Sequence, residues 1–168
     1  MKSIEERKKI VMPILERRMG GFTKPLKAGS LKNKVFGNSC TGYTFQLNTL
    51  SYRGVWVSTI EDIELTVDGE KVPKRDMLFC VRGLKIPIDN LGGHTEVFWG
   101  PEDDAIINVN KVGGLKPGEH KVEIVIKKRS DFGHSYREAE QGYENATEFH
   151  NPAIIKDEAV FTIEGEGK

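Results

Sequence analysis

The sequence predicts an all-β protein, an antiparallel β-sandwich, and three observations support this fold class. From residue 41 onward, apolar and polar residues alternate in short runs, and this period of two is typical of strands with one buried face. The 18 Gly and seven Pro residues among 168 are scattered between these runs, where a chain of strands needs turns. No long helices alternate with the expected strands, as they would in a parallel sheet. We therefore expect about eight short strands in two packed sheets.

The N-terminal part of the chain has a different composition. Residues 1–34 contain ten Lys or Arg against three Glu, whereas residues 35–168 contain 15 basic against 22 acidic residues. The first dozen residues are compatible with a short helix, which Pro13 would limit because proline lacks an amide donor. We expect a basic N-terminal arm over residues 1–38 and a β-sandwich domain over residues 39–168. The arm is either an electrostatic handle for a partner subunit or a solvated surface segment.

Residues that favour turns separate the expected strands. Asp68-Gly69 ends one alternating run and tolerates the positive φ values of a tight hairpin turn, so we expect a partner strand near Lys71-Val72. Pro87 and Pro101 are expected in loops or at sheet edges, because proline cannot donate to a strand ladder. The other runs that predict strands are residues 43–47, 63–67, 77–81, 96–99, 105–109, 122–126, 154–155 and 159–163.

The segment Leu115-Lys116-Pro117-Gly118-Glu119-His120-Lys121-Val122 gives the strongest single signal. Its Pro-Gly pair predicts a turn, and a long alternating strand follows. This arrangement resembles the corner that closes one sheet onto the other in immunoglobulin-like sandwiches, where an aromatic ring usually stands at the position of His120. The expected architecture is therefore an immunoglobulin-like or jelly-roll-like sandwich.

Composition and motifs argue against several classes of function. The sequence has no GxSxG, Walker, dinucleotide-binding or HExxH motif. Cys40 and Cys80 are far apart, which predicts free thiols in a reducing compartment. Twenty-five basic and 25 acidic residues cancel, so we expect neither nucleic acid nor a membrane as partner. Because no signal peptide or membrane span is recognisable, we expect a cytoplasmic protein.

Two segments are candidates for a contact surface. Residues 131–152 lack clear periodicity between two expected core strands, and long loops of this kind are usually functional or disordered. Aromatic residues mixed with Arg favour a contact surface, with a mobile loop as the alternative. Residues 51–56 place a second such group between two strands, although a core position for Trp56 and a turn contact for Arg53 remain open. The candidate partner-interface or substrate-adjacent residues are Tyr52, Arg53, Trp56, His134, Tyr136, Arg137, Tyr143 and His150.

Three stretches of the chain carry a resemblance to a known family. They are Thr41-Gly42-Tyr43-Thr44-Phe45-Gln46-Leu47, Ser51-Tyr52-Arg53-Gly54, and Ser58-Thr59-Ile60-Glu61-Asp62-Ile63-Glu64-Leu65-Thr66-Val67-Asp68-Gly69-Glu70. Together they resemble the small (β) subunit of bacterial C-glycoside deglycosidases. The later run Gly113-Gly114-Leu115-Lys116-Pro117-Gly118-Glu119-His120 is similar to a second signature of that family. The resemblance covers residues 41–127.

The resemblance implies a hetero-oligomeric lyase. In this family a β-sandwich subunit accompanies a larger TIM-barrel α subunit, which holds a divalent metal, usually manganese, and the catalytic base. The complex cleaves the carbon–carbon bond between a 3-keto sugar and an aromatic aglycone, as in flavonoid C-glucosides. A C3 ketone acidifies the C2 hydrogen, and a metal that polarises the ketone stabilises the enolate. We therefore expect a non-catalytic β subunit without a cofactor of its own.

Two other functions compete with this interpretation. A stand-alone carbohydrate-binding module would use exposed aromatic rings, and Tyr52, Trp56, Trp99 and Tyr143 are the candidates for such a platform. It would bind sugars without a partner. A self-sufficient metal enzyme would instead bring together His94, Glu96, His134 and His150. It would retain metal when isolated.

The guanidinium group of Arg53 suits a carboxylate across an interface. If this chain assembles with a larger subunit through Arg53, the substitution Arg53→Ala should weaken assembly by about 1–3 kcal/mol. Co-purification of the two subunits measures this, and an undiminished yield with Arg53→Ala would contradict the role of Arg53.

Overall fold

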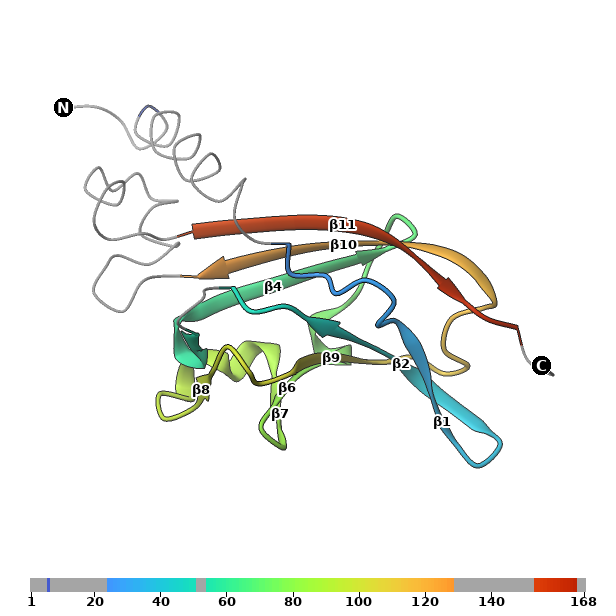
Figure 1. Cartoon of the computed structure of the whole chain (residues 1–168), viewed down its shortest axis with the longest axis horizontal. Coiled ribbons are helices and arrows are strands. Elements are labelled where there is room, and N and C mark those ends of the chain that lie inside the picture. The colour runs from blue at the N-terminus through green and yellow to red at the C-terminus, as the bar shows by residue number, and fades with distance from the viewer. Residues whose placement is uncertain (1–5, 7–23, 51–53, 129–152, 166–168) are drawn as a thin grey trace.

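The computed structural model describes residue 6 and residues 24–50, 54–128 and 153–165. Figure 1 shows two layers of strands, and every strand pair is antiparallel. The all-β prediction is confirmed. The five-stranded sheet has the order β1 (Lys32–Phe36), β2 (Ser39–Leu47), β9 (Ala105–Asn110), β6 (Met77–Val81) and β7 (Leu84–Pro87). The four-stranded sheet has the order β11 (Ala153–Ile163), β10 (Gly118–Lys128), β4 (Ile60–Val67) and β5 (Glu70–Lys71).

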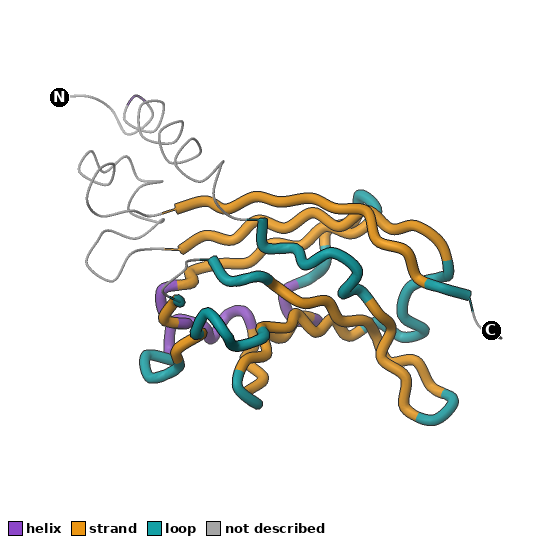
Figure 2. Tube along the Cα trace, in the orientation of Figure 1, coloured by secondary structure: helices purple, strands orange, loops and turns teal. Residues whose placement is uncertain are grey.

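Smaller elements connect the two sheets. A two-stranded ribbon pairs β3 (Val55–Trp56) with β8 (Phe98–Trp99). Short 3-10 helices are the remaining regular elements, as the purple segments of Figure 2 show for the described residues. They are η1 (Val57–Thr59), η2 (Lys74–Asp76) and η3 (Ile88–Gly93). None of the helices in the described part of the chain is long and apolar enough to cross a membrane.

The core lies between the two large sheets and follows the alternation that predicts it. In β6 and β9, in β4 from Ile63 onward and in β10 from His120 to Lys127, every second side chain is buried, while the side chains between them are partly or fully exposed. Phe79 and Trp99 meet edge to face in this core, with ring centroids 5.5 Å apart. The largest fully buried side chains are Trp99, Tyr43, Phe45, Phe79, Ile60, Ile63, Leu65, Met77, Ile86, Leu91 and Ile107.

Most expected strands are confirmed, including the short partner strand that follows Asp68-Gly69. The structure adds two edge strands, β1 and β7, and Pro87 ends β7 at the edge of its sheet. Strand β1 lacks an apolar alternation because Asn33 takes the inward position opposite Tyr43. The Asn33 amide donates to the Leu115 carbonyl over 2.9 Å and accepts from the Leu115 N–H over 2.9 Å. A polar residue thereby replaces an apolar one without leaving its groups unpaired.

Residues 24–31 lie within the basic arm predicted from composition and contribute to the sandwich. Leu26 and Leu31 are buried in the core, and Leu26 forms an isolated bridge with Leu47. The Leu26 N–H also donates to the Asp157 carboxylate of β11 over 3.0 Å. This segment therefore links one edge of the five-stranded sheet to the edge strand of the other sheet. The helix expected in the first dozen residues lies outside the described residues, apart from Glu6.

The corner predicted at His120 is present, with an imidazole in place of the usual phenol ring. Its Nδ1 lies 2.6 Å from Asp68 Oδ2, and its Nε2 lies 2.6 Å from the Lys116 carbonyl oxygen. The other Asp68 oxygen accepts the Lys121 N–H over 2.9 Å. Asp68 itself occupies the β4–β5 turn with a φ of 52°. These bonds fasten that turn to the start of β10.

Both ring nitrogens of His120 face acceptors, so the doubly protonated imidazolium fits the site best. Burial alone would lower the pKa of His120, but the hydrogen bonds to Asp68 and to the Lys116 carbonyl outweigh burial and raise it above the ordinary value. The hydrogen bond from His120 is the largest cause that lowers the pKa of Asp68. Each partner therefore favours the charged form of the other.

We predict that this pair makes the free energy of unfolding depend on pH. Because the pKa of His120 is raised on folding, its stabilisation is complete below the unfolded value of about 6.5 and is lost as the pH rises through the folded value. Because the pKa of Asp68 is lowered, its stabilisation is present above about 3.9 and is lost as the pH falls through the folded value. The pair therefore stabilises the fold most between about pH 4 and 6.5.

Urea unfolding of the wild type and of His120→Gln across this range measures the effect. Glutamine keeps hydrogen-bonding groups but carries no charge. Because the Asp68 side chain is 47% exposed, solvent screens the pair, and we expect a difference of about 1 kcal/mol near pH 5.5. The difference should shrink as the pH rises toward about 9. A difference that is constant with pH would contradict the charged pair.

Candidate functional site

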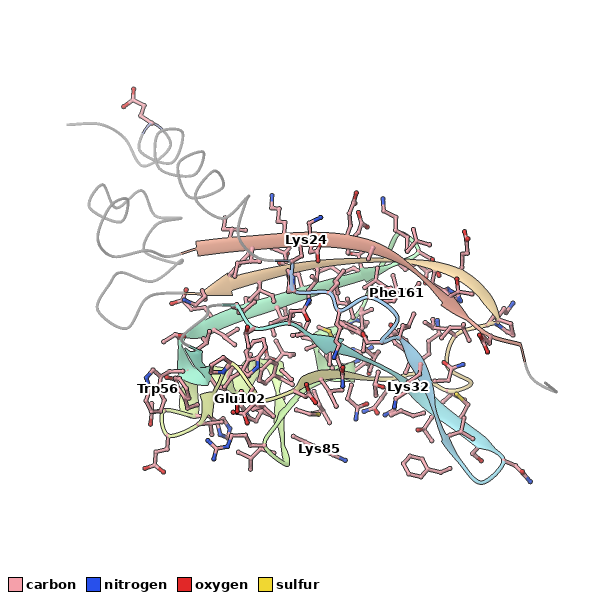
Figure 3. All side chains as sticks on the ribbon, viewed as in Figure 1. Lys24, Lys32, Trp56, Lys85, Glu102 and Phe161 are labelled. Carbon is pink, nitrogen blue, oxygen red and sulfur yellow. The ribbon has the colours of Figure 1, made fainter. Side chains whose placement is uncertain are left out.

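Only one of the residues that sequence reasoning singled out for a contact surface is described. Trp56 stands in β3 with 40% of its surface exposed. Its ring packs edge to face on Phe98 of β8, with centroids 4.9 Å apart. In Figure 3, Trp56 lies at one end of the molecule and Lys32 toward the other. The other candidates, Tyr52, Arg53, His134, Tyr136, Arg137, Tyr143 and His150, lie outside the described residues.

The position of the Trp56–Phe98 pair depends on a glycine. Gly54 has a φ of +86°, and a Cβ atom there would lie 2.6 Å from Phe98 Cζ and 2.7 Å from the Trp99 carbonyl oxygen. Neither distance is compatible with a side chain, so only glycine fits between the two strands. Trp99 itself is fully buried, and its indole N–H donates to the Asp103 carbonyl over 3.0 Å. It therefore presents no ring to solvent, which removes it from the aromatic platform of a carbohydrate-binding module.

The outer face of the four-stranded sheet is densely charged. Lys121 lies 3.6 Å from Glu123 and 3.4 Å from Glu158. Glu64 of β4 lies 3.5 Å from Lys127 and 3.7 Å from Lys71. Such networks of partly exposed ion pairs are typical of a surface that faces water.

The outer face of the five-stranded sheet is different. Its three central strands, β2, β9 and β6, alternate between buried residues and half-buried residues that point away from the core. The register places Thr44, Asn108 and Leu78 in one row across the three strands, and Gln46, Ile106 and Cys80 in a second row. None of these six outward residues is charged. We call Thr44, Gln46, Ile106, Asn108, Leu78 and Cys80 the uncharged face.

Lysines border the uncharged face on both sides. Lys32 and Lys34 come from β1, and the Lys34 ammonium donates to Asn110 Oδ1 over 3.0 Å. Lys85 of β7 is the cross-strand partner of Cys80. Burial raises the pKa of the Cys80 thiol, although Lys85 and Lys34 act in the opposite direction. The face therefore combines an uncharged centre with a basic rim, and protein interfaces commonly pair a charge-depleted centre with a polar rim.

One polar atom in the uncharged face lacks a partner. Asn108 Oδ1 is buried and has no hydrogen bond in the described part of the chain. A buried carbonyl oxygen without a donor costs about 1–3 kcal/mol, and each such group in a native protein needs an explanation. Atoms of this chain already enclose the oxygen, so a molecule docked on the face does not reach it. The outward positions of the alternating runs in the sequence would have predicted the uncharged face. They would not have predicted that Asn108 Oδ1 lacks a hydrogen bond.

The described residues contain no group of three or more His, Cys, Asp or Glu side chains placed to hold a metal ion. His94 caps the end of η3, and its N–H donates to the Leu91 carbonyl over 3.1 Å. His120 is engaged in the corner. Of the other members of the hypothetical metal site, Glu96 is exposed in a turn, and His134 and His150 fall in the part of the chain that is not described.

Comparisons with known proteins identify relatives. Residues 23–132 match the C-glycoside deglycosidase beta subunit family. The chain is 30% identical over 99 residues to the C-glycoside deglycosidase beta subunit of Eubacterium cellulosolvens, a stretch that covers 58% of this chain and 67% of that protein. It is 29% identical over 80 residues to the protein of the same name from Arthrobacter globiformis, which covers 46% of this chain and 60% of that protein.

The unpaired oxygen of Asn108 leads to a prediction for the isolated chain. The substitution Asn108→Leu replaces the amide by an apolar group of similar size, so it should raise the free energy of unfolding by about 1 kcal/mol. Chemical denaturation of both proteins measures this. The control Thr44→Val changes a neighbouring side chain on the same face that has no unpaired buried oxygen, and it should have a smaller effect. A clear loss of stability in Asn108→Leu would show that the amide is satisfied.

Proposed function

Because this chain belongs to the C-glycoside deglycosidase beta subunit family, we propose that it is the non-catalytic subunit of a hetero-oligomeric lyase. In this proposal a larger TIM-barrel subunit provides the divalent metal, manganese, and the catalytic base. The complex cleaves the carbon–carbon bond between a 3-keto sugar and an aromatic aglycone by elimination. The family membership supports the subunit role. The assignments of the metal, the base and the substrate are based on the family resemblance.

The chemistry explains the division of labour. A C-glycoside has no bridging oxygen that an acid could protonate, so the usual route of glycoside hydrolysis is closed. Elimination requires removal of the C2 proton next to a C3 ketone, and a metal supplies the polarisation of that ketone. The bond to C1 then breaks as the enolate collapses, and the aromatic aglycone leaves with the electron pair and is protonated. A supporting subunit would hold the barrel subunit in shape or complete its substrate cleft.

The uncharged face is the observation that carries the proposal. Its six outward residues contrast with the charged outer face of the four-stranded sheet of the same molecule. An interface centre loses charged residues because each buried charge must be desolvated. The basic rim of Lys32, Lys34 and Lys85 fits a partner surface with acidic residues around an apolar or polar, uncharged centre.

Trp56 marks a second contact region in this proposal. Partly exposed tryptophan is enriched at interface hot spots because its large ring buries much apolar surface at a small entropic cost. The ring is held against Phe98, so it is already ordered before a partner binds. In the sequence it follows shortly after Tyr52 and Arg53.

We predict that a charge in the uncharged face prevents assembly. Ile106→Glu introduces a carboxylate at the centre of the face and should weaken binding of the larger subunit by about 30-fold or more, because that carboxylate would be buried without a partner. The matched control is Val125→Glu. Val125 is also half-buried on a central strand and points outward, but it lies on the charged sheet, so the control should assemble normally.

Size-exclusion chromatography with light scattering measures assembly of this chain with the larger subunit, and cleavage of a 3-keto C-glucoside measures activity. The expected result is a complex that retains metal and activity with the wild type and with Val125→Glu, and two separate proteins with Ile106→Glu. Equal assembly of both variants would show that the uncharged face is not the interface. If the wild-type chain does not bind the larger subunit but binds sugars without a partner, the result would favour the carbohydrate-binding module.

A further inference from the structure

A cavity opens between the two large sheets, where the β4–β5 turn faces the end of β9. Its volume is about 430 Å³, which is within the range of about 300–1,000 Å³ for small-molecule sites. We propose that this cavity is a binding site for a neutral, hydroxyl-rich small molecule such as a sugar ring. The proposal goes beyond the function proposed above, which places substrate chemistry in the partner subunit, and it does not depend on that function.

The walls of the cavity combine apolar and polar side chains and come from both sheets. Val67 lies on β4 and Val109 on β9, and the chain after β5 adds Val72 and Pro73. Leu115 closes another side, where Asn33 holds its backbone through two hydrogen bonds. These elements are anchored in the sandwich, so the cavity is largely preformed. The polar share of these walls suits a ligand that carries many hydrogen-bonding groups.

Tyr43 supplies a buried donor. It is 1% exposed and lines the cavity, and its hydroxyl has no hydrogen bond among the described residues. Burial, with further contributions from the Asp68 and Asp76 carboxylates, raises the pKa of Tyr43 to about 12. The phenol therefore keeps its proton at neutral pH. An acceptor oxygen of a molecule bound in the cavity would take the place of water at this hydroxyl.

Asp76 supplies an acceptor near this donor. It lies half-buried at the end of η2, and its carboxylate has no hydrogen bond in the described parts of the chain. Asp68, in contrast, is already held by His120 and by the Lys121 N–H. Among the polar groups that line it, the cavity thus offers Tyr43 as a donor and Asp76 as an acceptor. A hydroxyl group both donates and accepts, so hydroxyl groups match this pair.

The charges around the cavity favour a neutral ligand. Three carboxylates line it, those of Asp68, Glu70 and Asp76, together with the two lysines Lys71 and Lys111. His120 lies against Asp68 and adds a positive charge when it is protonated. The net charge of the site is therefore too small to select an anion or a cation.

Amide chemical shifts of the isolated full-length chain, titrated with D-glucose, test the proposal. We expect saturable shifts around Tyr43 and Val109. Tyr43→Phe removes only the hydroxyl, and Asp76→Asn removes the charged acceptor, so each should weaken binding by about 3- to 10-fold. The control Asp104→Asn makes the same change in an exposed residue before the opposite end of β9. It should bind like the wild type.

Three results would overturn the proposal. The first is the absence of saturable shifts in the wild type, which would mean that the cavity holds only water. The second is equal binding by the wild type and by both cavity variants. The third is tighter binding of inorganic phosphate or of ethanolamine than of D-glucose. The titration uses the chain without a partner, so a failure to bind D-glucose would not contradict the subunit role. A failure of subunit assembly would likewise not contradict ligand binding in the cavity.

Discussion

The Asp68 carboxylate holds together parts of the chain that are far apart in the sequence. One oxygen binds His120 and the other binds the Lys121 N–H, so the turn after β4 is fixed against the start of β10. Through His120 the same carboxylate is linked to the Lys116 carbonyl, which sets the path of the Pro117-Gly118 turn. Strand β10 then pairs with both β4 and β11. The alignment of the four-stranded sheet, and one wall of the cavity beside Tyr43, both depend on this carboxylate.

The two outer faces of the sandwich divide its surface into unlike halves. Each strand buries one set of alternate residues in the common core. The other set points outward, so its composition can suit either water or another protein. On β4 and β10 that second set is dominated by Asp, Glu and Lys, as in Glu64, Glu123 and Lys127. On β2, β9 and β6 it is uncharged. A single fold thus carries one face suited to water and one face suited to another protein.

Alternation and turn chemistry predicted most of the fold because both are local properties of the sequence. The run through Ile63, Leu65 and Val67 and the Asp68-Gly69 turn are examples. Strand β1 escaped prediction because its inward residue, Asn33, is polar and is satisfied by Leu115, more than 80 residues away. Of the candidate site residues, Trp56 is described and partly exposed, and the others lie outside the described residues. The outward residues of the uncharged face were visible in the same runs, but the pairing of β2 with β9 and the unpaired atoms of Asn108 and Tyr43 exist only in three dimensions.

The hydrogen bond between Leu26 and Asp157 joins residues 131 positions apart. The segment around Leu26 can pair with β2 early, but its link to the other sheet forms only once β11 has been made. A nascent chain that has released β10 still exposes the edge that β11 will cover, and open strand edges are sites of aggregation. Synthesis of β11 is therefore the step that covers this edge of β10, and a chain stopped before β11 would leave that edge open to other chains.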